Sequence, residues 1–121
     1  MTLRECYESF DGNYEDVISR LIKEERITKY LGIFSSNDDY TPIKNAILAL
    51  NREEAFRGVH TLKGAALNLG LTPLSVASDE LCEYLRNPSA DPGAEEVNDM
   101  LEAVRVAYYK VIDKIKEYLG A

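Results

Sequence analysis

Apolar residues recur along most of the chain at steps of three and four, the spacing that places side chains on one face of a helix. Alternation of apolar and polar residues with a period of two, which is typical of strands, is missing throughout. The pattern therefore predicts an all-α protein. The longest apolar series, expected to form a helix from about residue 92 to residue 119, contains Val97, Leu101, Val104, Tyr108, Val111, Ile115 and Tyr118.

Capping residues and turn residues divide the rest of the pattern into shorter helices. Thr2 with Glu5 has the spacing of a capping box, and Asn13 with Asp16 has that of a second cap. Two short helices are therefore expected within residues 1–21. A further helix is expected from about residue 23 to residue 34, before the polar break at residues 35–38, with one apolar face formed by Ile27, Leu31 and Phe34.

The middle of the chain carries three more helix starts. Thr41, followed by a proline, offers an N-cap for a helix whose apolar positions are Ile43, Ile47 and Leu50. Asn51 offers the next cap, and Gly70 stands where a helix commonly ends in a left-handed glycine. Residues 72–73, a second Thr-Pro pair, begin a helix expected to run to about residue 86.

Short connections between helices favour antiparallel neighbours. We therefore expect a single domain over residues 1–121: an up-and-down antiparallel four-helix bundle in residues 23–119, with short N-terminal helices in residues 1–21 covering one end.

The charge balance narrows the range of partners. The chain has 14 Lys and Arg against 21 Asp and Glu, a net charge of -7, whereas nucleic acids and anionic membranes are bound by clustered cations. No apolar run approaches the roughly 20 residues of a membrane span, and no leader peptide is recognisable. Cys6 and Cys82 are too isolated for a disulfide framework or a metal cluster. The expectation is a cytoplasmic protein without nucleic-acid binding or membrane insertion.

His60 is the only histidine of the chain. Because each helical residue turns by about 100°, the residues of the 51–70 segment can be placed around the helix axis relative to His60. Arg57, Lys63, Gly64 and Leu67 fall around His60. His60 is therefore expected to point outward, away from a core face formed by Ala55, Gly58, Leu62, Ala65, Ala66 and Leu69.

Two neighbours of His60 suggest chemistry. Lys63 lies three residues later and Gly64 four residues later, so both border the imidazole on the next turn. A nearby cation disfavours imidazolium, and a neutral imidazole has a lone pair that can act as a nucleophile. The same ammonium would steady an anion on the ring. A glycine at position 64 destabilises the helix by about 1 kcal/mol relative to alanine. Such a cost is reasonable if another molecule has to approach the helix closely at this position.

The run His60-Thr61-Leu62-Lys63-Gly64, followed by Gly70 ten residues after the histidine, resembles the signature of the histidine-containing phosphotransfer (HPt) domain. The resemblance covers about residues 54–86. It implies a four-helix bundle whose exposed histidine accepts phosphoryl from an aspartyl phosphate on a receiver domain and passes it to another receiver.

The resemblance also implies a role for each matching residue. His60 would be the phospho-acceptor, Lys63 the cation beside the phosphoryl group, and Gly70 the end of the helix. Receiver docking would use Arg57, Gly64 and Leu67. In several members a polar side chain twenty-two positions after the histidine hydrogen-bonds the ring, but here that position is Cys82. The open alternatives for ring orientation are Asp79, Glu83 and no residue at all.

The implied partners are response-regulator receiver domains and a sensor histidine kinase, and the chain is expected to be a monomer. It offers no convergent oxygen ligands, so Mg²⁺ is expected from the receiver and no cofactor from this chain. In 121 residues there is no room for a nucleotide-binding domain, and the chain's glycines form no phosphate loop. The expected role is thus a phosphoryl carrier without autokinase activity.

The competing hypothesis is a non-catalytic helical adaptor in which His60 does nothing. Phe56 and Leu67, which lie near His60 on the wheel, would then form a protein-interaction surface. Neighbouring acidic pairs such as Glu53 and Glu54 point apart on a helix and are expected to be solvated. The eight tyrosines are expected at the bundle edges with their hydroxyls in water.

Overall fold

In the computed structural model, which describes residues 1–120, seven α-helices and no strand are present. The all-α class is confirmed. The helices are α1 (Leu3–Ser9), α2 (Tyr14–Leu21), α3 (Glu24–Ser36), α4 (Thr41–Leu48), α5 (Arg52–Asn68), α6 (Thr72–Arg86) and α7 (Glu95–Gly120). None of these helices is both long and apolar enough to cross a membrane.

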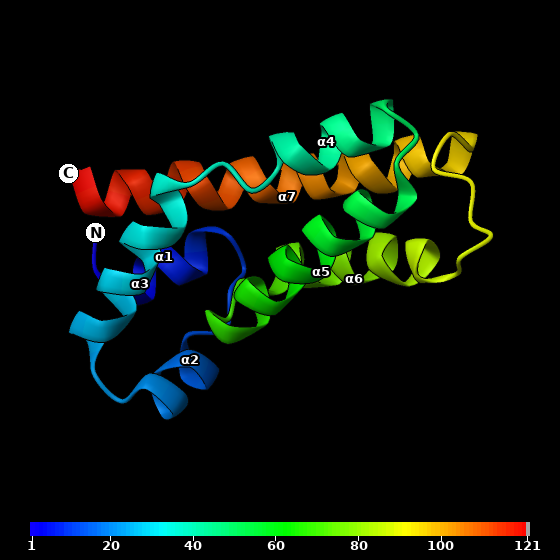
Figure 1. The fold of residues 1–121 in the computed structure, drawn as a ribbon. Helices are drawn as coiled ribbons and strands as arrows, with labels where there is room; N and C mark the ends of the chain where they lie inside the picture. Colours follow the sequence, from blue (N-terminus) through cyan, green and yellow to red (C-terminus); the bar gives the residue numbers. More distant parts are fainter. Residues whose placement is uncertain (121) are drawn as a thin grey trace.

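Helices α4 to α7 run alternately up and down, as Figure 1 shows. Helix α5 packs between α4 and α6, and α6 packs on α7. Helix α3 precedes α4 along the same side of α7, so one side of the bundle consists of two shorter helices separated by residues 37–40. Helices α1 and α2 lie at the end of the bundle where α7 finishes (Figure 1), as the N-terminal pattern predicts.

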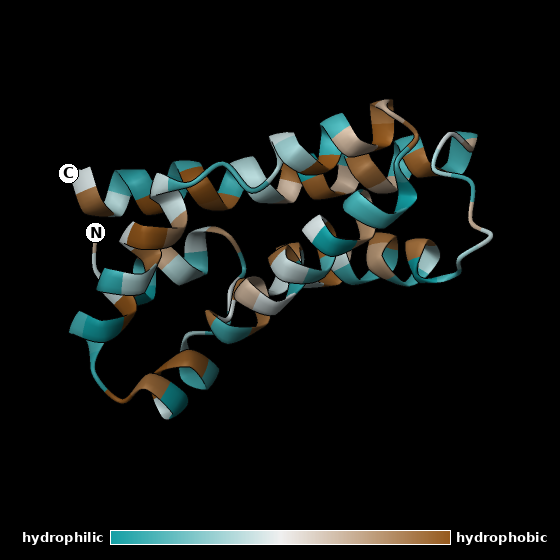
Figure 2. Cartoon of the chain, viewed as in Figure 1, coloured by the Kyte–Doolittle hydropathy of each residue, from teal (hydrophilic) through white to brown (hydrophobic). Residues whose placement is uncertain are grey.

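Apolar side chains from all seven helices meet in one core. Hydrophobic positions recur along the length of α7 and on the bundle helices beneath it, as Figure 2 shows. The expectation for the tyrosines is wrong for Tyr7, Tyr40 and Tyr108, which are buried. The Tyr7 hydroxyl donates to the carbonyl of Leu69 at 2.6 Å, and that of Tyr108 donates to the carbonyl of Asn37 at 3.0 Å. These backbone oxygens replace water as partners, which permits the burial.

Local capping signals are mostly confirmed. The Thr2 capping box is complete, and the side chains of Asn13 and Asn51 accept backbone N–H groups as expected. The start of α4 differs, because Thr41 is the first residue of the helix and not its cap. The carboxylate of Asp38 accepts the N–H of Thr41 at 2.9 Å. Leu50 is also placed wrongly by its spacing: it follows the end of α4, has a φ of 56° and is exposed.

The C-terminal end of α5 is anchored to the N-terminal helices. The Arg20 guanidinium donates to the carbonyls of Asn68 at 2.7 Å and Leu67 at 3.0 Å, beside the Tyr7 bond described above. The Asn13 N–H donates to the carbonyl of Gly70 at 2.8 Å. These groups satisfy carbonyls that a helix end leaves without partners. The helix that carries His60 is thereby held at one end.

Gly70 makes this anchoring possible. Its φ of 67° lies in the left-handed region, and a Cβ there would stand 2.8 Å from the carbonyl oxygen of Asn13. A larger residue would therefore be strained and would collide with the backbone of the N-terminal segment. The sequence-based prediction that Gly70 ends the helix agrees with the structure.

Candidate functional site

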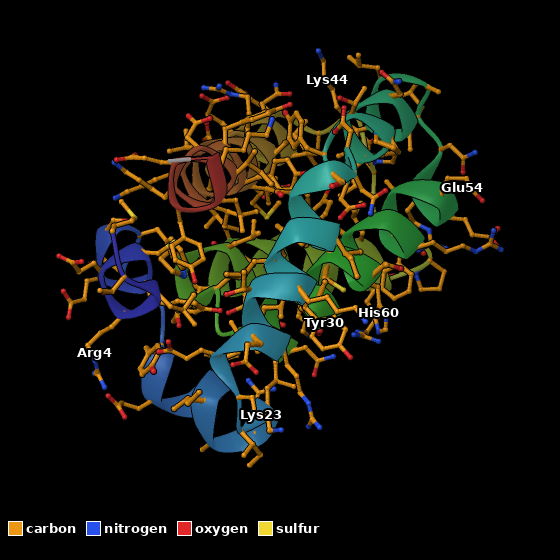
Figure 3. All side chains as sticks on the ribbon, turned by 90° about the vertical axis from the view of Figure 1, so that its left-hand side faces the viewer. Arg4, Lys23, Tyr30, Lys44, Glu54 and His60 are labelled. Atoms are coloured by element: carbon orange, nitrogen blue, oxygen red, sulfur yellow. The ribbon has the colours of Figure 1, made fainter. Side chains whose placement is uncertain are left out.

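The face of α5 that carries His60 is turned to solvent. The core side of this helix is formed by Ala55, Val59, Leu62 and Ala66. Val59 was missing from the expected core face, and Gly58 and Ala65 are only partly buried. Figure 3 shows His60 projecting from α5 at the edge of the molecule, on the side where Tyr30 of α3 is also found. The exposed imidazole can therefore be reached by another protein.

An aromatic ring flanks His60 one turn earlier on α5. The ring centroids of Phe56 and His60 are 5.7 Å apart, at an interplanar angle of 44°. Phe56 is partly buried against the core, and the Arg86 guanidinium lies 5.3 Å from its ring centroid. This cation–π contact and the core packing hold Phe56 in place. Phe56 therefore gives the imidazole a fixed apolar neighbour.

Lys63 lies one turn after His60 on α5, and its side chain is paired with helix α6. Its Nζ lies 2.8 Å from Oδ1 of Asp79 and 3.9 Å from Oε1 of Glu83. The hydrogen bond to Asp79 raises the pKa of Lys63 above its usual range, which favours the charged form of the side chain further. The two carboxylates considered as ring partners of His60 thus contact Lys63 instead.

No hydrogen bond to the His60 ring occurs within residues 1–120. Cys82, twenty-two positions after His60, is completely buried, and burial raises the pKa of its thiol. It therefore belongs to the core rather than to the surface around the imidazole. Of the residues considered for ring orientation, Cys82 is buried, and Asp79 and Glu83 lie beside Lys63.

The two glycines of α5 differ in their surroundings. A Cβ added to Gly64 would meet nothing within 4 Å, so this glycine lies on open surface. A Cβ at Gly58 would stand 2.9 Å from Cγ1 of Ile43, so that glycine allows α4 and α5 to approach closely. The open space at Gly64 agrees with a role outside the packing of the bundle.

Of the remaining residues proposed for docking, Leu67 is 54 % exposed. Arg57 is exposed but already paired, with a nitrogen 2.5 Å from Glu53 and another 2.6 Å from Glu54. Both carboxylates lie on the preceding turn of α5. The side chain of Leu67 is therefore exposed to solvent, whereas the guanidinium of Arg57 is paired with Glu53 and Glu54.

Sequence reasoning missed a second helix on this side of the molecule. Tyr30 and Ile33 of α3 are 44 % and 51 % exposed, and both line a groove that α3 forms with the C-terminal part of α5. The groove also contains Ala65 and Leu69. The signal was available, because Tyr30 and Ile33 are apolar but lie off the face formed by Ile27, Leu31 and Phe34.

Residues 1–120 contain no group of three or more His, Cys, Asp or Glu side chains placed to hold a metal ion. The charged groups nearest to the imidazole along the chain and on α6 are instead arranged as ion pairs. What this site offers chemically is an exposed imidazole with cationic side chains one turn away on either side, Arg57 and Lys63.

Comparison with known families agrees with this geometry. The model of the Hpt domain family matches residues 34–107 of the 121 residues, a span that includes α4, α5, α6 and about half of α7. The chain belongs to the Hpt domain family, and the resemblance seen in the sequence is confirmed. Its general role is histidine phosphotransfer in a phosphorelay, as a phosphoryl carrier module. No curated protein and no solved structure matches the chain.

Proposed function

We propose that this protein accepts phosphoryl on His60 from the aspartyl phosphate of a receiver domain and passes it to a second receiver. The observation that carries the proposal is the position of the only histidine, exposed in the middle of α5 within the residues that match the Hpt family. The H-x-x-K-G spacing around it supports the same reading.

The transfer requires one nucleophilic substitution at phosphorus. The lone pair of a neutral imidazole nitrogen forms an N–P bond while the bond between phosphorus and the aspartyl oxygen breaks. The aspartate leaves as a carboxylate, and the other ring nitrogen keeps its hydrogen. The second step is the reverse reaction on another receiver. His60 thus provides the bond-forming atom, and Lys63 provides positive charge beside the incoming oxygens.

The surface around His60 supports docking of a receiver. Gly64 leaves open space one turn after the imidazole, and Leu67 adds an exposed apolar side chain one turn further on. We include Gly64 and Leu67 in the docking surface, together with Arg57 if its pairs with Glu53 and Glu54 open. Mg²⁺ held by the receiver's acidic residues would balance the phosphoryl charge during transfer.

The wider setting follows from the same role. We propose a cytoplasmic, monomeric carrier that works between a sensor histidine kinase and response-regulator receivers and makes no phosphohistidine from ATP by itself. The domain is proposed to extend over the whole of residues 1–121, beyond the residues that match the family.

Replacement of His60 by glutamine tests the proposal. His60→Gln removes the nucleophile, whereas helicity and the melting temperature should stay nearly unchanged because an exposed side chain contributes little packing. The wild-type chain and the variant are incubated with a phosphorylated receiver, and label on the chain is followed. The wild type should take up acid-labile, alkali-stable label and the variant none.

Two outcomes would contradict the proposal. Label that persists on His60→Gln would assign the acceptor to another residue. A wild-type chain that binds the receiver but takes up no label would favour the adaptor hypothesis. Circular dichroism of both proteins serves as the folding control.

A further inference from the structure

The side chain of Lys63 reaches away from its own helix. Its Nζ lies 2.8 Å from the carboxylate of Asp79 on α6, and only 23 % of the side chain is exposed. Because its partner is on α6, the ammonium of Lys63 points across to the neighbouring helix instead of along α5. The cation next to His60 is therefore held by a carboxylate before any phosphoryl group arrives.

Glu83 is a poor substitute for Asp79. Its carboxylate accepts three short contacts from Arg86, at 3.0, 3.2 and 3.3 Å, whereas Lys63 lies 3.9 Å away. In this cluster the two positive charges, on Lys63 and Arg86, are matched by two negative charges, on Asp79 and Glu83. A phosphoryl group on His60 must consequently compete with Asp79 for the ammonium of Lys63.

We propose that Asp79 is a positioning residue that holds Lys63 toward α6 and thereby sets the equilibrium of phosphoryl transfer. This inference rests on the proposed function. As the N–P bond forms at His60 and the bond to the aspartyl oxygen breaks, the phosphoryl oxygens attract Lys63, and the contact with Asp79 lengthens. Because Asp79 still attracts the ammonium of Lys63, Lys63 stabilises the phosphohistidine less than an unpaired lysine would. The phosphoryl group is therefore passed onward more readily.

The substitution Asp79→Asn tests this inference, with Glu80→Gln as the matched control. Both remove one negative charge from neighbouring positions of α6, but Glu80 lines the hollow between α6 and α7 instead of contacting Lys63. Each protein is equilibrated with a phosphorylated receiver, and the labelled fraction is measured. The lifetime of the phosphohistidine is measured separately after loading with phosphoramidate and removal of the donor.

Asp79→Asn should shift the equilibrium toward the phosphorylated chain by about three- to tenfold and lengthen the phosphohistidine lifetime, as expected for one freed charge near a surface. Glu80→Gln should match the wild type, and Asp79→Glu should restore most of the wild-type equilibrium. Melting temperatures should differ little, because a single ion pair near the protein surface contributes little stability. Equal equilibria for Asp79→Asn and Glu80→Gln would overturn the inference.

The double variant separates positioning from direct repulsion. If Asp79 acts through Lys63, Asp79→Asn should have no effect in a Lys63→Ala background. An undiminished shift in that background would overturn the positioning role. Failure of the proposed function looks different, because the wild type itself would then take up no label on His60.

Discussion

Phe56 and Lys63 give His60 two unlike neighbours on one face of α5. The phenyl ring lies against the imidazole, whereas the ammonium is held by Asp79 on α6. With no hydrogen bond from residues 1–120 to fix it, the exposed ring can turn about its side-chain torsions.

Gly64 offers a test of the docking geometry at a single residue. Gly64→Gln improves helix propensity by several tenths of a kcal/mol, and its side chain enters open space, so the melting temperature should stay equal or rise slightly. The new side chain would occupy the space that a receiver needs beside His60. Transfer from a phosphorylated receiver should fall steeply, while phosphoramidate, which needs no docking, should still phosphorylate His60.

Gly58→Ala is the control for this experiment. Its Cβ would stand 2.9 Å from Ile43, so this smaller change should lower the melting temperature even though Gly64→Gln does not. Unimpaired transfer from the receiver to the Gly64→Gln variant would remove the steric argument. A loss of stability in that variant would mean that Gly64 takes part in helix packing.

At the scale of helices, the bond between Tyr7 and the end of α5 is open to a direct test. Tyr7→Phe deletes the buried hydroxyl and leaves the carbonyl of Leu69 without that donor, which costs about 1–3 kcal/mol. The midpoint of urea unfolding should fall, while phosphorylation of His60 under native conditions should continue. Tyr30→Phe alters an exposed tyrosine and should leave the midpoint unchanged. Equal midpoints for the two variants would contradict the anchoring role of Tyr7.

Helix boundaries were predictable where their cause lies within one turn. Thr2 with Glu5, Asn13 and Asn51 bond to backbone groups three residues away, so the sequence alone contains both partners. Leu50 has the spacing of a helical apolar position but lies outside α4. The chain reverses direction there, with Leu50 at a positive φ, before Asn51 caps the next helix. Burial of Tyr7 was not predictable, since its partner at Leu69 is distant in the sequence.

In the candidate site, too, features that depend on one helix were predictable and features that depend on packing between helices were not. The outward direction of His60 follows from the periodicity of one helix, and the structure agrees with it. The pairing of Lys63 with Asp79 depends on how α5 and α6 are rotated against each other, which no local pattern specifies. The contribution of α3 through Tyr30 also depends on packing between elements distant in the chain.

At the scale of the whole molecule, two adjacent carboxyls between α3 and α4 contribute in opposite directions to the way stability varies with pH. Burial raises the pKa of Asp39 above its ordinary 3.8, so its ionised form opposes folding at neutral pH. Hydrogen bonds from Thr41 lower the pKa of Asp38, so its ionised form favours folding. The penalty at Asp39 and the gain at Asp38 are both lost as the pH falls and the carboxyls become protonated.

Asp39→Asn should therefore raise the urea midpoint at about pH 7, and this gain should disappear at about pH 3, where the Asp39 carboxyl is protonated. Asp38→Asn should have the opposite effect at about pH 7, because it weakens the acceptor at the start of α4. A pH-independent effect of Asp39→Asn would show that the substitution acts through packing instead.

The joint between the N-terminal helices and Gly70 bears on how this domain can be transplanted. A chimeric protein built only from the residues that match the family, 34–107, would include His60 but lack Arg20, Tyr7 and Asn13, the groups that close the end of α5. It would also lose the half of α7 that packs beside α1 and α3. The part of the chain needed in such a chimera is therefore larger than the part that matches the family. It should carry residues 2–120, which include the Thr2 cap of α1.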